Sequence, residues 1–180
     1  MCQKRKSISC ITLLFFDGRS VDLLGALYEG DASGDVRTYG YRVGTNRKAR
    51  EYMMKIMGYP ASETHLLQRI FRHQTVHLGQ PKAVIVDKRK RRKIGWKLED
   101  TYKGKHMVIE KLPIIRQSHI LTPYKMTLDH LFIISVKKFM YDIRHSITKV
   151  PDGYLEIVKQ KRIFQDKFEK AIEQIYDPYN

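Results

Sequence analysis

A chain of 180 residues with 42% hydrophobic and 29% charged residues has the composition of a soluble globular protein, and its length suggests one domain with room for an inserted piece. About 70% of the extended chain's surface can be buried at this size, so a core needs neither disulfides nor a metal. The 34 Lys and Arg residues exceed the 19 Asp and Glu residues by 15. This excess makes nucleic acid the first partner to consider, and a basic protein without a polyanionic ligand is the plainer alternative.

The N-terminus combines basic and apolar residues without forming a targeting signal. Lys4–Lys6 precede the apolar run Ile8–Phe16, but that run is short and no small-residue cleavage site follows it. Cys2 and Cys10 have neither a metal-ligand spacing nor a disulfide framework, which fits a reducing compartment. No segment approaches the ~20 apolar residues of a membrane span. We therefore expect a cytoplasmic protein with no membrane partner.

The first third of the chain predicts an apolar element, a loop and a helix. Apolar residues of Ile8–Tyr28 can share one helical face, but Gly18 and Gly25 each cost about 1 kcal/mol inside a helix. A strand over Ile8–Phe16 followed by a short helix from Ser20 is the alternative. The Gly- and Asp-rich stretch Gly30–Gly44 predicts a loop. A helix over Thr45–Met57 follows. Its expected inward face holds Ala49, Tyr52, Met53 and Ile56.

The stretch His65–Lys82 combines an apolar helical stripe with a polar cluster. Its helix begins near Ser62, and Gly79 and Pro81 end it. The stripe consists of Leu66, Leu67, Ile70 and Phe71. The polar cluster consists of Arg69, Arg72, His73 and His77. This cluster is the most informative feature of the sequence.

After this stretch the apolar pattern changes from helical to extended and back. Short strands are expected at Ala83–Val86, Ile94–Leu98 and His106–Lys111, and these form an antiparallel meander inserted at residues 82–112. A long helix over Met126–Ile147 and a last helix ending near Tyr176 follow. The predicted fold is mainly α: a helical bundle with a small three-stranded antiparallel β insertion, forming one domain over residues 1–180.

The polar cluster contains the groups that cut RNA without a metal. An imidazole such as that of His77 can act as general base or acid, and the fixed charge of Arg72 can stabilise the phosphorane. Arg72 and His77 enclose four residues, a spacing that resembles the R-x4–6-H motif of the HEPN superfamily (higher eukaryote and prokaryote nucleotide-binding domains). His73 matches the polar residue that commonly follows the Arg of that motif, and Val21–Gly30 resembles an early helix of the family.

The resemblance implies a metal-independent endoribonuclease or RNA-binding protein of toxin or defence type, without a cofactor. It also implies a homodimer with paired motifs at its interface, and an antitoxin partner for a toxin. Five positions on an ideal helix turn about 140° beyond one full turn, so Arg72 and His77 converge only if the helix ends near His77 or if a second subunit completes the site. The plain alternative is a helix-terminal His77 that interacts with the helix dipole and a solvated Arg72.

A run of six cations is the second candidate site. Lys88, Arg89, Lys90, Arg91, Arg92 and Lys93 are expected at a hairpin tip, where they can hold a nucleic-acid backbone together with Arg69 and Lys82. Stacking surfaces for unpaired bases are expected from Trp96, Tyr102 and Tyr59. A solvated turn is the plain alternative for the run, and a nuclear-import signal is a further one. A non-catalytic nucleic-acid-binding or protein-binding module that uses the same basic surface is the alternative function.

A metal site is a weaker alternative for the polar cluster. His73 and His77 have the i, i+4 spacing of paired zinc ligands. A third ligand would have to come from His65, Asp87 or His130. The nearby cations Arg69, Arg72 and Lys82 oppose a divalent ion, so we expect no metal.

Overall fold

The chain divides into two compact units, each described here by itself. The structure is a computed structural model that describes residues 19–33, 37–38, 41–42, 45–72, 85–87, 92–113 and 128–177. Unit 1 consists of Met1–Phe15 and Ser62–Phe139, and unit 2 consists of Phe16–Ala61 and Met140–Asn180. The expectation of a single domain over residues 1–180 stays a prediction.

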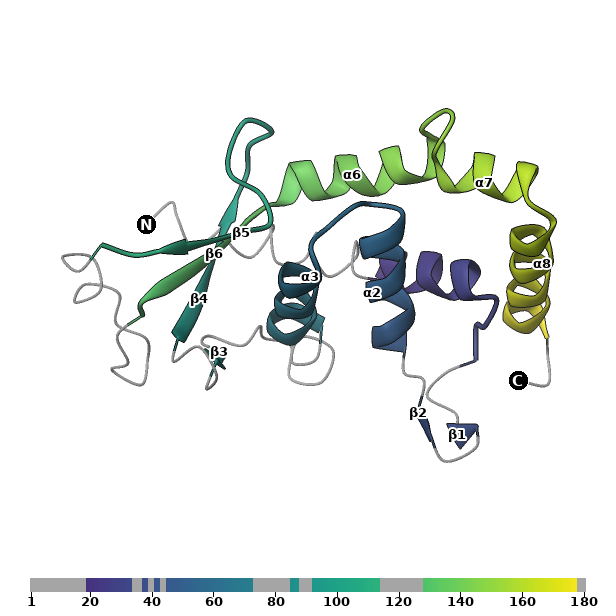
Figure 1. Cartoon of the computed structure of the whole chain (residues 1–180), viewed down its shortest axis with the longest axis horizontal. Coiled ribbons are helices and arrows are strands. Elements are labelled where there is room, and N and C mark those ends of the chain that lie inside the picture. The colour runs from purple at the N-terminus through teal and green to yellow at the C-terminus, as the bar shows by residue number, and fades with distance from the viewer. Residues whose placement is uncertain are drawn as a thin grey trace. The chain divides into compact units, whose positions relative to one another are not determined.

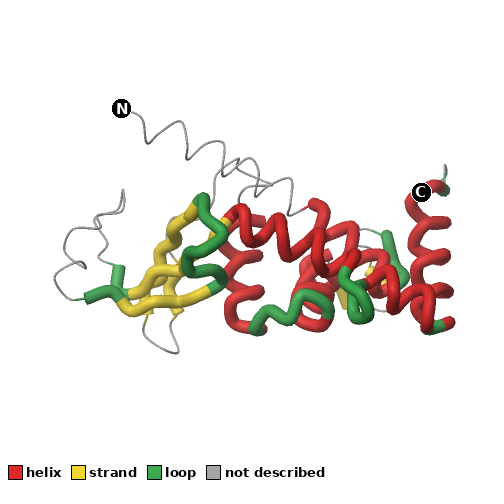
Figure 2. Tube along the Cα trace, turned by 90° about the horizontal axis from the view of Figure 1, so that it is seen from above, coloured by secondary structure: helices red, strands yellow, loops and turns green. Residues whose placement is uncertain are grey.

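A four-stranded mixed sheet forms the centre of unit 1 (Figures 1 and 2). Its strands are β3 (Ile85–Asp87), β4 (Arg92–Glu99), β5 (Val108–Lys111) and β6 (His130–Ser135), in the spatial order β3-β4-β6-β5. β3 runs antiparallel to β4, and β5 runs antiparallel to β6. β4 and β6 are parallel, so the strand that comes last in the sequence lies inside the sheet.

This sheet shows that the predicted fold class is wrong. The chain is not a mainly α bundle with a three-stranded antiparallel meander, because β6 separates β4 from β5 and pairs with β4 in parallel. The predicted helix over Met126–Ile147 contains this strand, and the helix itself, α6 (Val136–Thr148), begins only where β6 ends. A strand buried between two neighbours is apolar on both faces, so the run Leu131–Ile134 lacks the alternation that marks a half-exposed strand.

The register of the sheet separates a packed face from an open one. Ile94 lies beside His130 and Trp96 beside Phe132, so these side chains share one face, and Ile94 and Phe132 are buried. Exposed side chains of the other face are Val86, Lys97 and Val108. A Cβ on Gly95 would lie 2.4 Å from Cδ1 of Leu128, so Leu128 covers part of this second face.

The stretch that begins at His65 is helical, as predicted, but its winding changes. α3 (Ala61–Leu67) passes directly into the π-helical turn η1 (Gln68–Arg72). Leu66, Leu67 and Ile70 are buried, which confirms these three members of the apolar stripe. The helix therefore packs through the expected face, and its last described turn is wider than an α-helix.

Unit 2 is mainly helical. It holds a helix over residues 19–29, α2 (Thr45–Lys55), the part of α6 from Met140 onward, α7 (Tyr154–Gln160) and α8 (Arg162–Tyr176). A small hairpin, β1 (Arg37–Thr38) with β2 (Tyr41–Arg42), lies in the stretch expected to be a loop. α2 ends within two residues of its predicted boundary. Three of its expected inward residues are buried: Ala49, Tyr52 and Met53.

Gly25 and Lys48 fix the first helix of unit 2 to α2. A Cβ on Gly25 would lie 2.5 Å from the backbone N of Ala49, so the two helices meet backbone to backbone at a residue without a side chain. The buried Nζ of Lys48 donates to the carbonyls of Asp31 (2.8 Å) and Ser33 (3.1 Å) and lies 2.6 Å from Oδ2 of Asp31. Burial by itself raises the pKa of Asp31, but hydrogen bonds from Lys48 and Ser33 and the charge of Lys48 hold it below its usual value.

Aromatic rings fill the core of unit 2. The ring centroid of Tyr52 lies 6.1 Å from that of Tyr28 and 5.8 Å from that of Tyr154, both in edge-to-face geometry. The hydroxyl groups of Tyr52 and Ser146 share a hydrogen bond of 3.0 Å. Burial raises the pKa of Tyr52 to about 12, despite the opposing hydrogen bond with Ser146. These rings join helices that are distant in the sequence.

Candidate nucleic-acid interface

The excess of positive charge belongs almost entirely to unit 1. Unit 1 contains 20 Lys and Arg residues against 6 Asp and Glu residues, a net charge of +14. Unit 2 contains 14 against 13, a net charge of +1. A charge concentrated in one compact unit produces a stronger local potential than the same charge spread over the chain. Unit 1 is therefore where a polyanion would be attracted.

The run of six cations connects two paired strands. Asp87, the last residue of β3, lies opposite Arg92, the first residue of β4, so the four residues 88–91 join the paired ends of an antiparallel hairpin. These four residues lie outside the described part of the chain, whereas Arg92 and Lys93 belong to β4. The pairing agrees with the expected hairpin, and a role of the run in binding stays a prediction.

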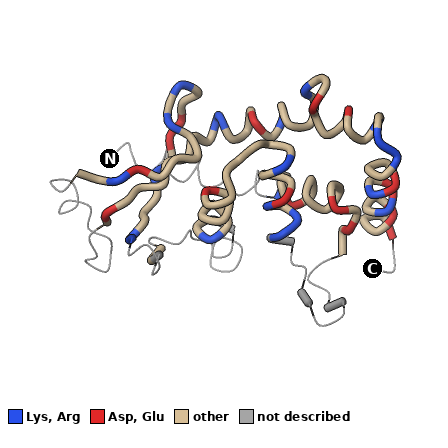
Figure 3. The backbone as a smooth tube through the Cα atoms, in the orientation of Figure 1, with Lys and Arg blue, Asp and Glu red and all other residues tan. Residues whose placement is uncertain are grey.

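Three strand ends meet at the same end of the sheet as this run. The start of β4, the start of β6 and the end of β5 lie in register, with His130 beside Ile94 on one side and beside Lys111 on the other. We call this end the basic edge and define it as Lys88–Lys93, Lys111, Asp129 and His130. Figure 3 marks Lys and Arg in blue at the described start of β4 and at the end of β5. Neither Lys93 nor Lys111 has an ion-pair partner among the described residues.

Asp129 ties the three strands together at the basic edge. Its N–H donates to the carbonyl of Lys93 (3.1 Å), and its own carbonyl accepts the N–H of Leu112 (2.8 Å). Its Oδ1 accepts the N–H of Lys93 (2.7 Å) and shares a hydrogen bond of 2.7 Å with Nδ1 of His130. These hydrogen bonds hold the starts of β4 and β6 and the residue after β5 against one another. Among the described residues of the basic edge, Lys93, Asp129 and His130 therefore belong to one hydrogen-bonded strand end.

Sequence reasoning missed the role of these two residues. It names His130 only as a possible third zinc ligand and gives Asp129 no part, because both fall inside the predicted helix over residues 126–147. The continuous apolar run Leu131–Ile134 is the signal that could have found them, since a buried strand there places the Asp-His pair at its start. The pair then lies at a sheet end instead of on a helix.

The predicted catalytic residues lie mostly outside the described part of the chain. Arg69 is exposed on η1, and η1 ends at Arg72, of whose side chain the structure gives no description. His73, His77 and Lys82 fall outside the described residues, so their mutual geometry stays a prediction. Within the described residues no three His, Cys, Asp or Glu side chains are grouped as they would be around a metal ion.

Other lysines of unit 1 face carboxylates of the same unit. Nζ of Lys97 lies 2.8 Å from Oε1 of Glu99, and Nζ of Lys137 lies 3.2 Å from Oδ1 of Asp100. Lys105 is similarly paired with Glu110. Such exposed pairs contribute at most about 1 kcal/mol each and can exchange a carboxylate for a phosphate. The Lys97–Glu99 and Lys137–Asp100 pairs lie at the end of the sheet opposite the basic edge and partly neutralise that end.

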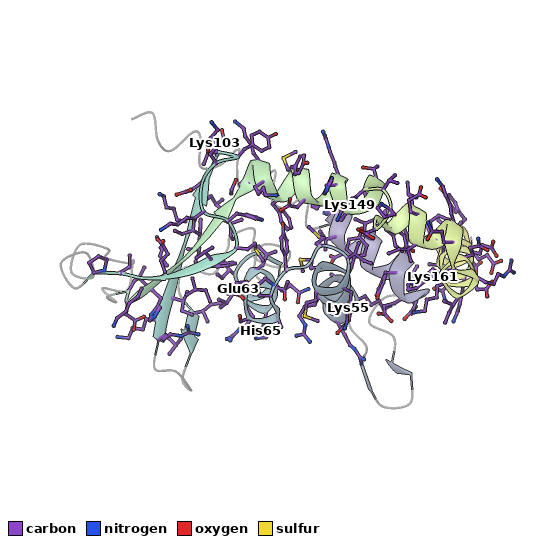
Figure 4. All side chains as sticks on the ribbon, turned by 45° about the horizontal axis from the view of Figure 1, so that its top comes forward. Lys55, Glu63, His65, Lys103, Lys149 and Lys161 are labelled. Atoms are coloured by element: carbon purple, nitrogen blue, oxygen red, sulfur yellow. The ribbon has the colours of Figure 1, made fainter. Side chains whose placement is uncertain are left out.

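The aromatic residues expected to stack on bases differ in access. Tyr102 is 62% exposed on the loop between β4 and β5, the loop on which Figure 4 labels Lys103. Trp96 lies on the packed face of the sheet beside Phe132. Tyr59 belongs to unit 2, where its hydroxyl donates to Oδ2 of Asp142 (2.7 Å). Tyr102 is therefore the most accessible of the three to an unpaired base, but it follows the end of β4 that lies opposite the basic edge.

Comparisons with known proteins provide no relative for this chain: no protein-family model, no curated protein and no solved structure matches it. None of the helices among the described residues has both the length and the apolar character that crossing a membrane requires.

Proposed function

We propose that the chain binds nucleic acid through the basic edge of unit 1. The observation that carries this proposal is the concentration of charge: unit 1 has a net charge of +14, and seven of its cations belong to the basic edge. Lys and Arg bind nucleic acid by displacing counterions condensed on the phosphates, so each contact adds affinity and salt dependence. We expect RNA over DNA because Arg72 and His77 keep the spacing of the R-x4–6-H motif.

The experiment compares two variants of equal net charge. The hairpin variant replaces the six cations of Lys88–Lys93 with Gln. The control variant replaces six exposed cations of unit 2 with Gln: Lys55, Lys149, Lys159, Lys161, Arg162 and Lys170. Figure 4 labels Lys55, Lys149 and Lys161. Both variants lower the net charge from +15 to +9, so a difference between them reports where the charge lies.

The measurement is fluorescence anisotropy with labelled RNA and DNA single strands of about 20 nucleotides, between about 50 and 200 mM salt. We expect the hairpin variant to lose about 100-fold in affinity. The slope of log K, the association constant, against log salt concentration should become less steep by about 4. The control variant should lose no more than about threefold. Equal losses of affinity in both variants would show that binding depends on net charge and not on the basic edge. A wild-type chain that binds neither RNA nor DNA at low salt would refute the proposal.

A second candidate function is metal-independent RNA cleavage by the polar cluster. It is favoured by the π-helical turn η1, which ends at Arg72, because such turns interrupt helices frequently at functional sites. In this proposal His77 is the general base or acid, Arg72 stabilises the charged phosphate and His73 is a second polar group. A homodimer and an antitoxin partner would accompany it as the family resemblance implies. Because unit 1 contains a mixed sheet instead of the expected helical bundle, the resemblance depends on the motif and on the helix that precedes it.

RNA cleavage in EDTA tests this second function. The wild-type chain should cleave, and Arg72→Ala and His77→Ala should each reduce the rate about 100-fold or more. His145→Ala, an exposed histidine of unit 2, is the matched control and should leave the rate unchanged. If the wild-type chain binds RNA but does not cleave it, the binding function stands alone.

A further inference from the structure

The loop that joins β4 to β5, residues 100–107, is attached to the end of β6 by one buried residue. Ser135, the last residue of β6, is 0% exposed. Its Oγ donates a hydrogen bond to the carbonyl of Thr101, and its N–H donates to Nδ1 of His106 (3.1 Å). Thr101 lies near the start of the loop and His106 near its end. Both sides of the loop are therefore hydrogen-bonded to the same strand end.

The middle of the loop contains a tight turn. The N–H of Lys103 donates to Oγ1 of Thr101 (3.2 Å). A Cβ on Gly104 would lie 2.4 Å from Oε2 of Glu99 and 2.6 Å from Cγ2 of Thr101, so the chain folds back closely at a residue without a side chain. Figure 1 shows the loop reaching beyond the ends of β4 and β5. Thr101 and Lys103, the neighbours of Tyr102 on both sides, thus take part in the hydrogen bonds of this loop.

This loop presents an aromatic ring and a cation that no described residue engages. Tyr102 is 62% exposed, and Lys103 is also exposed. Among the described residues, the Tyr102 side chain has no hydrogen-bond or ring partner and the Lys103 ammonium has no ion-pair partner. A tyrosine has only two side-chain torsions, so its ring is ordered on binding at a low cost in entropy. An accessible ring beside an unpaired ammonium suits a ligand that has both flat rings and negative charge.

We propose that the β4–β5 loop is a base-stacking contact for single-stranded nucleic acid, in which Tyr102 stacks on an unpaired base and Lys103 contacts the phosphate beside it. This inference rests on the proposed binding function. Charge identifies the ligand class, because the net charge of +14 on unit 1 attracts a polyanion. A single strand offers unstacked bases to an aromatic side chain, whereas a duplex keeps its bases stacked on one another.

The distance along β4 allows one strand to reach both ends of the sheet. From Lys93 to Glu99 there are six steps of about 3.3 Å, which add up to about 20 Å. At about 3.4 Å per stacked nucleotide, six nucleotides cover this distance. Lys97 lies between the two ends, on the same face of β4 as Lys93, and its exposed pair with Glu99 can exchange for a phosphate. A strand of about 20 nucleotides is therefore long enough to contact Lys93 and Tyr102 together.

The experiment measures fluorescence anisotropy of the full chain with three RNA probes of about 20 nucleotides. The first is a single strand, the second is a duplex of the same sequence, and the third is an abasic single strand that keeps every phosphate and lacks the bases. Tyr102→Ala should lose about tenfold in affinity for the first probe and less than about twofold for the other two. Tyr102→Phe keeps the ring and should bind like wild type. Tyr176→Ala, which removes a 77% exposed tyrosine of unit 2, is the matched control and should also bind like wild type.

Lys103→Gln tests the phosphate contact separately. It should weaken binding of the single strand about threefold and make the slope of log K against log salt concentration less steep by about 0.7, and an unchanged slope would contradict this contact. The stacking contact is wrong if Tyr102→Ala binds the single strand as tightly as wild type, or if it loses as much affinity for the abasic strand. It is also wrong if Tyr102→Phe binds as weakly as Tyr102→Ala. A wild-type chain that binds none of the probes at low salt would instead refute the proposed function.

Discussion

Gly25→Ala tests the backbone contact between the first helix of unit 2 and α2. The new Cβ would lie 2.5 Å from the N of Ala49, 2.5 Å from the carbonyl C of Lys48 and 2.7 Å from the Cα of Ala49. Carbon atoms in contact prefer about 3.5–4 Å, so the helices have to separate by about 1 Å. Backbone atoms cannot rotate away as a side chain can. Overpacking of this kind costs about 1–3 kcal/mol and sometimes more.

The higher helix propensity of alanine opposes this steric cost. Ala stabilises a helix interior by about 1 kcal/mol relative to Gly, so Gly25→Ala would raise stability if the helix were free. Because the contact is with backbone, we expect the steric cost to exceed this gain and the free energy of unfolding to fall by about 1–2 kcal/mol.

Urea unfolding with two probes measures the effect. Far-UV circular dichroism reports mainly the helices, and fluorescence of Trp96, the one tryptophan of the chain, reports unit 1. Leu23→Ala, at a half-exposed position on the same helix, is the control and should change the free energy of unfolding by less than about 1 kcal/mol. An unchanged or increased stability of Gly25→Ala would show that the two helices do not approach this closely.

Three further changes have defined expectations. Lys48→Met removes the buried cation beside Oδ2 of Asp31 and the donor to the carbonyls of Asp31 and Ser33, and should cost about 2 kcal/mol in urea unfolding; a loss below about 0.5 kcal/mol contradicts the buried role of Lys48. Because the folded pKa of Asp31 is lowered, its carboxylate stabilises the fold above the unfolded value of about 3.9, and this contribution is lost as the pH falls through the folded value. The stability difference between wild type and Asp31→Asn should therefore shrink from pH 6 to pH 3, and a constant difference contradicts it. Gly95→Ala should cost about 1 kcal/mol through its contact with Leu128, and the cost should vanish in a Leu128→Ala background; an equal cost in both backgrounds would place the contact elsewhere.

Helices with a clear apolar period were predictable from the sequence. α2 ends close to its predicted boundary, and its inward residues Ala49, Tyr52 and Met53 are buried. The apolar residues Leu66, Leu67 and Ile70 are buried as expected. In each case the side chains repeat at the helical spacing on one face, so local pattern and tertiary packing agree.

The sheet was only half predictable. Strands β3, β4 and β5 were located to within a few residues, because β-branched and aromatic residues lie between turn residues. The partner of β4 was not predictable locally. β6 lies between two strands and carries apolar residues on both faces, and α6 follows it without a turn. The sequence pattern was therefore most simply interpreted as one helix that begins before β6. The parallel pairing then follows from tertiary contacts that the sequence pattern does not encode.

The candidate site shows the same division. The six cations at the β3–β4 hairpin follow from composition and turn chemistry. Lys111, Asp129 and His130 join them only because strands that are distant in the sequence end together. Gly25 is a further example. Its free-energy cost inside a helix argues against a helix at this position, but the close contact with α2 requires a residue without a side chain.

Lysine acetylation in the presence and absence of RNA tests most directly whether the basic edge binds nucleic acid. Mass spectrometry of the wild-type chain reports the acetylation rate of each lysine. We predict that RNA slows acetylation of Lys88, Lys90, Lys93 and Lys111, and that the rates of Lys159 and Lys170 in unit 2 stay the same. Protection centred on unit 2, or an equal slowing of all lysines, would contradict the assignment of binding to this edge.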